Sequence, residues 1–244
     1  MITCMVAARN EEDHLKSSVL DIISSAKQTG LEDYEIIIVN DGSTDQTAKI
    51  ANELKEKHSC IKVIHHKVTK GIGFSVREAI DLSTKQKFAF FAGDHNWHPE
   101  MAKGLFENCQ KAPFVITYFV NTESRKRIRN LLSTIFSTIY ITIFDLHVKY
   151  INGNAVYDKH LLKNMSLKST GFSIFAEIHV KLLRTGVLFL EIPTFMSPDT
   201  SKSQALRLKT LLNVSFMFLS LVFEIYVTKR EQYSKQARRM NIPL

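Results

Sequence analysis

Short apolar runs alternate with amphipathic segments along the first 120 residues. Stripes such as Leu15, Val19 and Ile22 recur at helical spacing. The runs between the stripes are rich in Ile, Val and Phe and cover residues 2–8, 35–40, 61–66, 88–93 and 114–120. Nearly continuous apolarity is typical of strands that are covered on both faces, as in a parallel sheet. The alternation predicts right-handed β-α-β units in an α/β, doubly wound and mostly parallel sheet flanked by helices.

The second half of the chain changes character. Basic residues at 125–129 precede a long apolar segment rich in β-branched residues, which ends near Asp145. The remaining predicted elements are strands at 150–158 and 187–193, a helix at 172–186, and an apolar segment at 211–227 followed by a basic tail at 229–239. We therefore expect one domain at 1–203 and a helical, apolar and basic C-terminal extension at 204–244.

Composition narrows the class of protein. The 244 residues are 45% hydrophobic and 23% charged, which excludes a disordered or fibrous chain. Lys and Arg exceed Asp and Glu by 32 to 24, so a net charge of +8 favours polyanionic partners such as a nucleotide phosphate or an anionic membrane face. No nucleic acid is expected, because the aromatic residues fall in apolar runs. Three cysteines without a CxxC pair, and no secretory signal pattern, predict a cytoplasmic protein.

Three predicted strands end in polar, acidic sequence, at residues 9–12, 41–45 and 93–96. In open parallel sheets, ligands bind beyond the carboxyl ends of the strands. The segment 41–45 allows two interpretations. Gly42 permits a tight turn and Ser43 or Thr44 can cap the next helix, or Asp41 accepts hydrogen bonds from a nucleobase or ribose.

The segments VAARNEED (6–13), VNDGSTDQT (39–47) and GIGFSVREAI (71–80) resemble family 2 glycosyltransferases with the GT-A fold. The resemblance covers residues 2–203 and is greatest to the polyprenyl-phosphate, dolichyl-phosphate mannose synthase-like branch. It implies a Rossmann-like sheet and a nucleotide-diphospho-sugar donor. The donor-binding positions that it implies are Ala7, Ala8, Arg9, Glu11, Asp41, Gly71, Gly73, Asp94 and Lys202. Ala7 and Arg9 replace the Pro and Tyr usual in the family, and the family's loop Arg is not evident near Lys202.

The resemblance also implies a metal site in FAGDHNWHPEM (91–101). Mg²⁺ or Mn²⁺ there would neutralise the diphosphate leaving group. Asp94 is the implied metal ligand and a catalytic residue, with His95 or Asn96 as helpers. Family members often carry Asp-x-Asp here, whereas this chain has Ala92 at the first acidic position. Packing and capping ahead of Pro99 is the alternative for His95 and the preferred interpretation for His98.

For the acceptor side, the resemblance implies Glu177 as a catalytic carboxylate. Glu177 would act as general base toward a hydroxyl acceptor, or would orient a phosphate acceptor that is already an anion. An ion pair with Lys181 at i+4 is the alternative interpretation. Asn152 and Gly153 either shape the sugar site or form a structural turn.

The apolar segment 211–227 is short and contains Glu224, so it is poorly suited to span a bilayer. The apolar segment after Arg129, which Thr, Ser and Tyr residues interrupt, is also poorly suited to span. With the basic residues at 125–129 and 229–239, both segments predict interfacial helices in peripheral contact with an anionic leaflet. A buried helix or the face of a homo-oligomer are the alternatives.

We therefore expect an inverting, metal-dependent glycosyltransferase that acts on a polyprenyl phosphate at the cytoplasmic membrane face. The nearest alternative acceptor is a hydroxyl of a glycan or lipid-linked saccharide in cell-envelope polysaccharide synthesis. A non-catalytic relative that serves as an interaction module is a third alternative, because Ala92 removes an acidic residue. A nucleotidyltransferase is disfavoured, because ARNEED follows the first strand in place of a glycine-rich basic loop.

Overall fold

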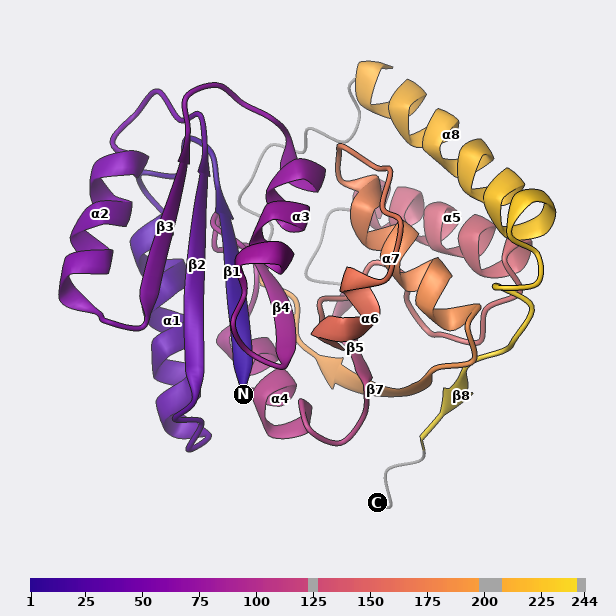
Figure 1. Ribbon diagram of the computed structural model, residues 1–244, viewed down its shortest axis with the longest axis horizontal. Helices are drawn as coiled ribbons and strands as arrows, with labels where there is room; N and C mark the ends of the chain where they lie inside the picture. Colours follow the sequence, from indigo (N-terminus) through magenta and orange to yellow (C-terminus); the bar gives the residue numbers. More distant parts are fainter. Residues whose placement is uncertain (123–126, 198–207, 241–244) are drawn as a thin grey trace.

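The computed structural model describes residues 1–122, 127–197 and 208–240, and its centre is a single mixed sheet (Figure 1). The strands lie in the order β3-β2-β1-β4-β6-β5-β7-β8. Their bounds are β1 Ile2–Ala8, β2 Tyr34–Asp41, β3 Ile61–His66, β4 Lys87–Ala92, β5 Phe114–Phe119, β6 Ala155–Asp158, β7 Leu188–Thr194 and β8 Arg238–Arg239. Only β6 among these runs antiparallel to its neighbours, so the predicted mostly parallel α/β sheet is confirmed.

Helices cover both faces of the sheet (Figure 1). One face packs against α1 Leu15–Gln28, α2 Thr47–Lys57 and α4 Pro99–Asn108. The other packs against α3 Ile72–Leu82, α5 Arg127–Ile143, α6 Lys159–Lys163, α7 Ser173–Leu183 and α8 Leu208–Phe223. Because side chains alternate along a strand, Cys4 and Val6 of β1 join the first core and Met5 joins the second. Covering on both faces explains the continuous apolar runs.

The strand predicted at 150–158 is shorter than expected. Only Ala155–Asp158 is extended, and the preceding residues form a turn. A side chain on Gly153 would collide with the carbonyl oxygen of Thr117. The structural-turn interpretation of Gly153 therefore accounts for this residue, since the chain passes directly over β5 at this point.

The C-terminal segment packs back onto the molecule. α8 continues into a turn of π-helix, η2 Glu224–Thr228, and lies beside α5 (Figure 1). The Phe218 ring centroid is 5.0 Å from that of Tyr140 and 5.6 Å from that of Phe144. Two later residues pair with β7 as β8, a strand too short for the sequence to predict. The proposed boundary between 203 and 204 lies outside the described residues, so the domain division stays a prediction. In the described part of the chain, no helix combines the length and apolarity needed to cross a membrane.

Candidate functional site at the strand ends

The loops after β1 and β2 are joined at the carboxyl edge of the sheet. The amide of Thr44 donates to Oδ1 of Asn10 at 2.9 Å, and the amide of Asn10 donates to Oγ of Ser43 at 3.0 Å. Asn10 adopts a left-handed backbone with φ of 57°. Two of the three polar strand ends therefore meet as predicted. The capping role expected for Ser43 or Thr44 is wrong, because α2 begins later, after Gln46.

Asp41 fixes the segment that leads into α3. Its carboxylate accepts hydrogen bonds from the amides of Lys70 and Gly71, at 2.8 and 2.9 Å, and from the Thr69 hydroxyl at 2.9 Å. Nδ1 of His66 lies 2.7 Å from Oδ1. Burial alone would raise the pKa of Asp41, but these donors outweigh it and lower the pKa. The predicted contact with base or ribose stays a prediction, and the carboxylate already binds four donors of its own chain.

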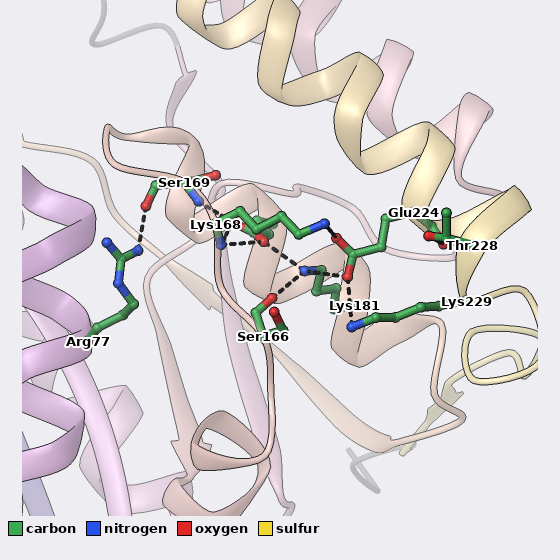
Figure 2. A network of polar contacts seen from close by, with 9 residues as sticks. Arg77, Ser166, Lys168, Ser169, Lys181, Glu224, Thr228 and Lys229 are labelled. Carbon is green, nitrogen blue, oxygen red and sulfur yellow. Dashed lines mark hydrogen bonds and ion pairs between the residues drawn. The ribbon is translucent and has the colours of Figure 1, made fainter.

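Gly71 and Gly73 make room for a neighbouring loop. Gly71 precedes α3 with φ of 89°, and a side chain there would meet the Thr170 carbonyl oxygen at 2.8 Å. A side chain on Gly73 would collide with the Ser169 carbonyl oxygen. Arg77 donates to that same oxygen at 2.7 Å (Figure 2), so it is neither a solvated surface residue nor a free phosphate ligand here. A helix start packed beneath a loop accounts for both glycines, and their contact with the donor stays a prediction.

Asp94 lies in the turn that follows β4, at the same edge as the end of β1. The amide of Gly93 donates to the Ala7 carbonyl at 2.8 Å, and a side chain on Gly93 would lie 2.7 Å from that oxygen. The close approach brings the β4 turn against β1. Asp94 itself accepts hydrogen bonds from the amide and side chain of Asn96, at 3.1 and 2.9 Å.

Glu11 stands close enough to Asp94 for their charges to interact. Burial raises the pKa of Glu11 to about 7, and the negative charges of Asp94 and Asp45 add to the shift. No described residue donates a hydrogen bond to the Glu11 carboxylate. The remaining positions predicted to line the donor site are at the end of β1, where Ala7 is half-buried, Ala8 is buried and Arg9 is exposed.

The pair Asp94 and Glu11 fits part of a divalent metal site. Mg²⁺ and Mn²⁺ prefer carboxylate oxygens, and a dication would offset the repulsion that raises the pKa of Glu11. Within the described ranges, no group of three or more His, Cys, Asp or Glu side chains is arranged to hold a metal ion. The two carboxylates therefore suit an ion whose remaining ligands come from a bound diphosphate and water, as is common for Mg²⁺.

The residues after Asp94 serve the local structure. Nε2 of His95 lies 2.7 Å from Oδ2 of Asp21 on α1, which orients the ring, and its role as a helper of Asp94 stays a prediction. His98 begins α4, where its Nδ1 accepts from the Glu100 amide at 3.2 Å. The preferred capping interpretation of His98 is confirmed.

Glu177 lies on α7 in a buried ionic network. Its Oε1 is 2.7 Å from Nζ of Lys181, which matches the i+4 ion pair considered from the sequence. Its carboxylate also accepts hydrogen bonds from the amides of Lys168, at 3.0 Å, and Ser169, at 2.8 Å. The structure thus joins Glu177 to the loop over α3 and not to Asp94. Its catalytic role stays a prediction, and Lys202 lies outside the described residues.

Sequence reasoning missed the second carboxylate of this network. Glu224 opens the π-helical turn, and its side chain is only 2% exposed. Its oxygens lie 2.7 Å from Nζ of Lys168, 3.0 Å from that of Lys181 and 3.3 Å from that of Lys229 (Figure 2). Burial would raise the pKa of Glu224, but these lysines lower it to about 2. A signal was available in the sequence: Glu224 lies in one apolar segment and Lys181 in another. Because buried charges need partners, the two residues could have been predicted to pair.

The family model described as Glycosyl transferase family 2 matches residues 3–168. The chain belongs to this family. Its GT-A fold is also found in mannosyl-3-phosphoglycerate synthase from Rubrobacter xylanophilus, with a TM-score of 0.70 at 18% identity, covering 100% of this chain and 78% of that one. Glucosyl-3-phosphoglycerate synthase from Mycobacterium tuberculosis, solved with Mg²⁺ and UDP, gives 0.66 at 17% identity, covering 92% and 78%.

A relative by sequence is the dolichyl-phosphate beta-glucosyltransferase of Dictyostelium discoideum. It is 35% identical over 93 residues, which are 36% of this chain and 28% of that protein. The chain spans about a third or less of the length of this and two other curated relatives that it matches. The residues that the family model matches, 3–168, include the ends of β1, β2 and β4.

Proposed function

We propose that the chain is an inverting glycosyltransferase that moves a sugar from a nucleotide-diphospho-sugar to a polyprenyl phosphate at the cytoplasmic face of a membrane. The observation that carries the proposal is the convergence of the ends of β1, β2 and β4 at one edge of the sheet, where Asn10 binds Thr44 and the Gly93 amide binds the Ala7 carbonyl beside Asp94. Family membership supports the donor class, and the name of the Dictyostelium relative supports a polyprenyl-phosphate acceptor.

Asp94 and Glu11 would hold Mg²⁺ or Mn²⁺ at the donor diphosphate. When bound, such an ion supplies positive charge that stabilises the departing nucleoside diphosphate. The acceptor phosphate oxygen attacks the anomeric carbon as the bond from that carbon to the diphosphate oxygen breaks. The attacking oxygen is already an anion, so no side chain has to remove a proton. Glu177 would therefore act as an orienting residue, through the loop that it holds, and not as a base.

The remaining site residues would bind the donor. Ala7, Ala8 and Arg9 would line the nucleobase pocket, because they end the strand next to Asp94. Asp41 would support the base or ribose directly or through the segment that it fixes, which ends at Gly71. Lys202 would contact a phosphate group.

A hydroxyl acceptor on a glycan or lipid-linked saccharide is the second candidate. The two structural neighbours are named for transfer to phosphoglycerate, which is not a lipid. A hydroxyl must lose a proton during attack, so this candidate requires a general base where the phosphate acceptor does not. Turnover with a short polyprenyl phosphate in detergent, compared with soluble saccharide acceptors, separates the two.

The first test is a thermal-shift panel with UDP, GDP, CDP and ATP, each with and without Mn²⁺. A ligand at about one hundred times its Kd should stabilise the fold by about 2.7 kcal/mol. We expect a metal-dependent shift with one nucleoside diphosphate, which would identify the donor base. No shift with any nucleotide in folded protein would overturn the proposal in favour of a non-catalytic relative.

A further inference from the structure

The helix α5 exposes its apolar face to solvent. Ile128, Leu131, Leu132, Ile135, Ile139 and Ile143 are each between 39% and 58% exposed. Their spacing of mostly three and four residues places them along one side of the helix. An amphipathic helix normally buries such a stripe, and large exposed apolar surfaces mark contact with a partner or a membrane.

The opposite side of α5 faces inward and is mixed, because Tyr140 packs in the apolar core and polar side chains lie beside it. It forms one wall of a cavity of about 270 Å³ beside the end of β5. The polar side chains that α5 contributes to the wall are Asn130, Ser133, Thr134, Ser137 and Thr138. The helix thus places hydroxyl groups along the cavity, beside the core-packed Tyr140, and six aliphatic side chains on its solvent side.

The cavity offers donors that are not fully used by the protein. Nζ of Lys149 lies 3.8 Å from the centre of the Tyr118 ring, and no carboxylate of the described residues pairs with it. Oγ of Ser133 lies 2.9 Å from the Tyr150 hydroxyl. Oγ of Ser137 is buried and has no hydrogen-bond partner. A cation and several hydroxyls, with no Asp or Glu in the wall, suit an anion rich in acceptor oxygens such as a phosphate.

The cavity lies at the end of β5, at the same edge of the sheet as the Asp94 turn, because β5 and β4 both run antiparallel to β6 between them. Its wall includes Met196, whose amide donates to Oδ1 of Asn121 at 2.6 Å. The preceding residue, Phe195, packs its ring 6.1 Å from that of His98, which begins α4 just after Asp94. A phosphate in the cavity would therefore lie on the same side of the molecule as the proposed donor site.

α8 extends the outward apolar face. Phe216, Leu219, Phe223 and Val227 are between 57% and 71% exposed, and their spacing places them on one side of the helix. The Tyr226 hydroxyl donates to the Ile143 carbonyl, which joins the two helices at this end. We call these four residues, together with the six of α5, the α5–α8 surface. Arg127, which begins α5, and Arg230, which follows η2, are exposed at its ends.

We propose that α5 is the wall between an anionic membrane and a phosphate-headgroup cavity. The α5–α8 surface lies on the bilayer, and the phosphorylated head of a lipid acceptor enters the cavity toward Lys149 and Ser137 while its hydrocarbon chain stays in the lipid. This inference rests on the proposed function, since it supplies the place of the polyprenyl phosphate. The exposed arginines Arg127 and Arg230 at the ends of this apolar surface favour an anionic leaflet as the occupant.

Vesicle flotation tests the membrane contact. The wild type should float with vesicles of phosphatidylcholine and phosphatidylglycerol and less with pure phosphatidylcholine. Ile135→Gln with Ile139→Gln should lower the partition coefficient about tenfold or more, since apolar area buried in the interface is lost. Leu20→Gln with Leu82→Gln is the matched control, as these side chains are 37% and 53% exposed on α1 and α3. Equal loss in both double variants, no binding by wild type, or a wild-type dimer that Ile135→Gln with Ile139→Gln dissociates would each overturn the membrane assignment.

Calorimetric titration with a water-soluble short-chain prenyl monophosphate tests the cavity. Lys149→Gln should weaken binding about tenfold, the scale of one charge-assisted hydrogen bond, whereas Lys16→Gln on α1 and the Ile135 and Ile139 double variant should bind normally. Ser137→Ala should weaken binding less. Normal binding by Lys149→Gln overturns the cavity assignment, and inorganic phosphate binding as tightly as the prenyl phosphate overturns its lipid source. If the cavity assignment fails but a nucleoside diphosphate still raises the melting temperature, the proposed function stands. Failure of the cavity assignment can therefore be distinguished from failure of the proposed function.

Discussion

β2 and α5 contain similar runs of aliphatic residues and place them in opposite surroundings. Ile36, Ile38 and Val39 of β2 are fully buried, whereas Ile135 of α5 is 47% exposed. Helices cover both faces of the sheet at β2, whereas one side of α5 exposes its aliphatic side chains to solvent. The difference shows that an apolar stripe predicts which side of a helix or strand is removed from contact with water. The stripe does not indicate whether that side packs against the protein's own core or against an external partner such as a membrane.

The two regions also use carboxylates differently. At the strand ends, Asp41 is satisfied by loop amides, a hydroxyl and His66, and Glu11 is left without a described donor. Under α8, Glu177 and Glu224 share Lys181 in a buried network. We therefore expect substitutions at the strand ends to change ligand binding and turnover. Substitutions in the network under α8 should change the free energy of unfolding.

The largest expected loss of stability follows Lys181→Met. Lys181 is fully buried between Glu177 and Glu224, and removing it leaves two buried carboxylates short of a partner. Breaking a buried pair in this way costs about 3–5 kcal/mol, to be measured by urea unfolding. Lys103→Met removes the exposed pair with Glu100 and should cost no more than about 1 kcal/mol. Similar losses in the two variants would show that burial of the network contributes nothing.

Asp94→Asn should lower turnover about a hundred- to a thousandfold, the scale of losing one electrostatic contact to a transition state. The amide keeps the size of the side chain but removes the charge that would hold the metal. Turnover with the donor found by thermal shift is the measurement, and the fold should melt normally. Glu100→Gln, an exposed carboxylate in the first turn of α4, is the control. Wild-type turnover by Asp94→Asn would remove this residue from the site.

Ile38→Ala and Ile139→Ala compare the two surroundings directly. Ile38 is fully buried, so its truncation should cost about 2–5 kcal/mol in free energy of unfolding. Ile139 is 45% exposed, and its truncation in detergent-free buffer should change stability by less than about 0.5 kcal/mol. A large loss for Ile139→Ala would mean that the α5 face is packed against another copy in solution.

Much of the sheet could be predicted because its signals are local. Runs such as 35–40 are apolar on both faces of a strand, and the strand-end position of Asp41 follows from where the run stops. The Glu177–Lys181 pair was visible as an i+4 spacing. Partners distant in sequence were not predictable: the Arg77 contact with Ser169, and the meeting of Glu224 with Lys181, depend on how α7 and α8 pack. For the segment after Arg129, the sequence left an interfacial and a core-packed helix open, because its pattern is the same whichever face lies inward.

Gly73→Ala should destabilise the fold by about 1–3 kcal/mol, the usual cost of overpacking. The added methyl group would collide with the Ser169 carbonyl, and backbone must move to admit it. Gly171→Ala is the matched control, from the loop that Gly73 of α3 packs against, since a side chain there meets nothing within 4 Å. If the two variants melt together, close packing is not the reason for glycine at 73, and a direct contact with the donor becomes the better explanation.

The last prediction concerns the pH dependence that Glu224 gives to the stability of the wild type. This contribution does not change with pH near neutrality and is lost progressively in acid. Its pKa is about 2 in the folded protein, against an ordinary 4.5, because Lys168, Lys181 and Lys229 outweigh the effect of burial. Below pH 4.5 the unfolded chain takes up more protons than the folded one, so stability falls as the pH drops toward 2 and is constant in this respect above 4.5.

Urea unfolding at pH 6, 4 and 3 should therefore show the Glu224→Gln variant less stable than wild type at pH 6, with the gap narrowing in acid as the wild type loses its charge advantage. The exposed Glu231→Gln serves as control and should follow the wild type at each pH. A gap that stays constant down to pH 3 would mean that packing of the π-helical turn, and not the ionised carboxylate, is what Glu224 contributes to the region beneath α8.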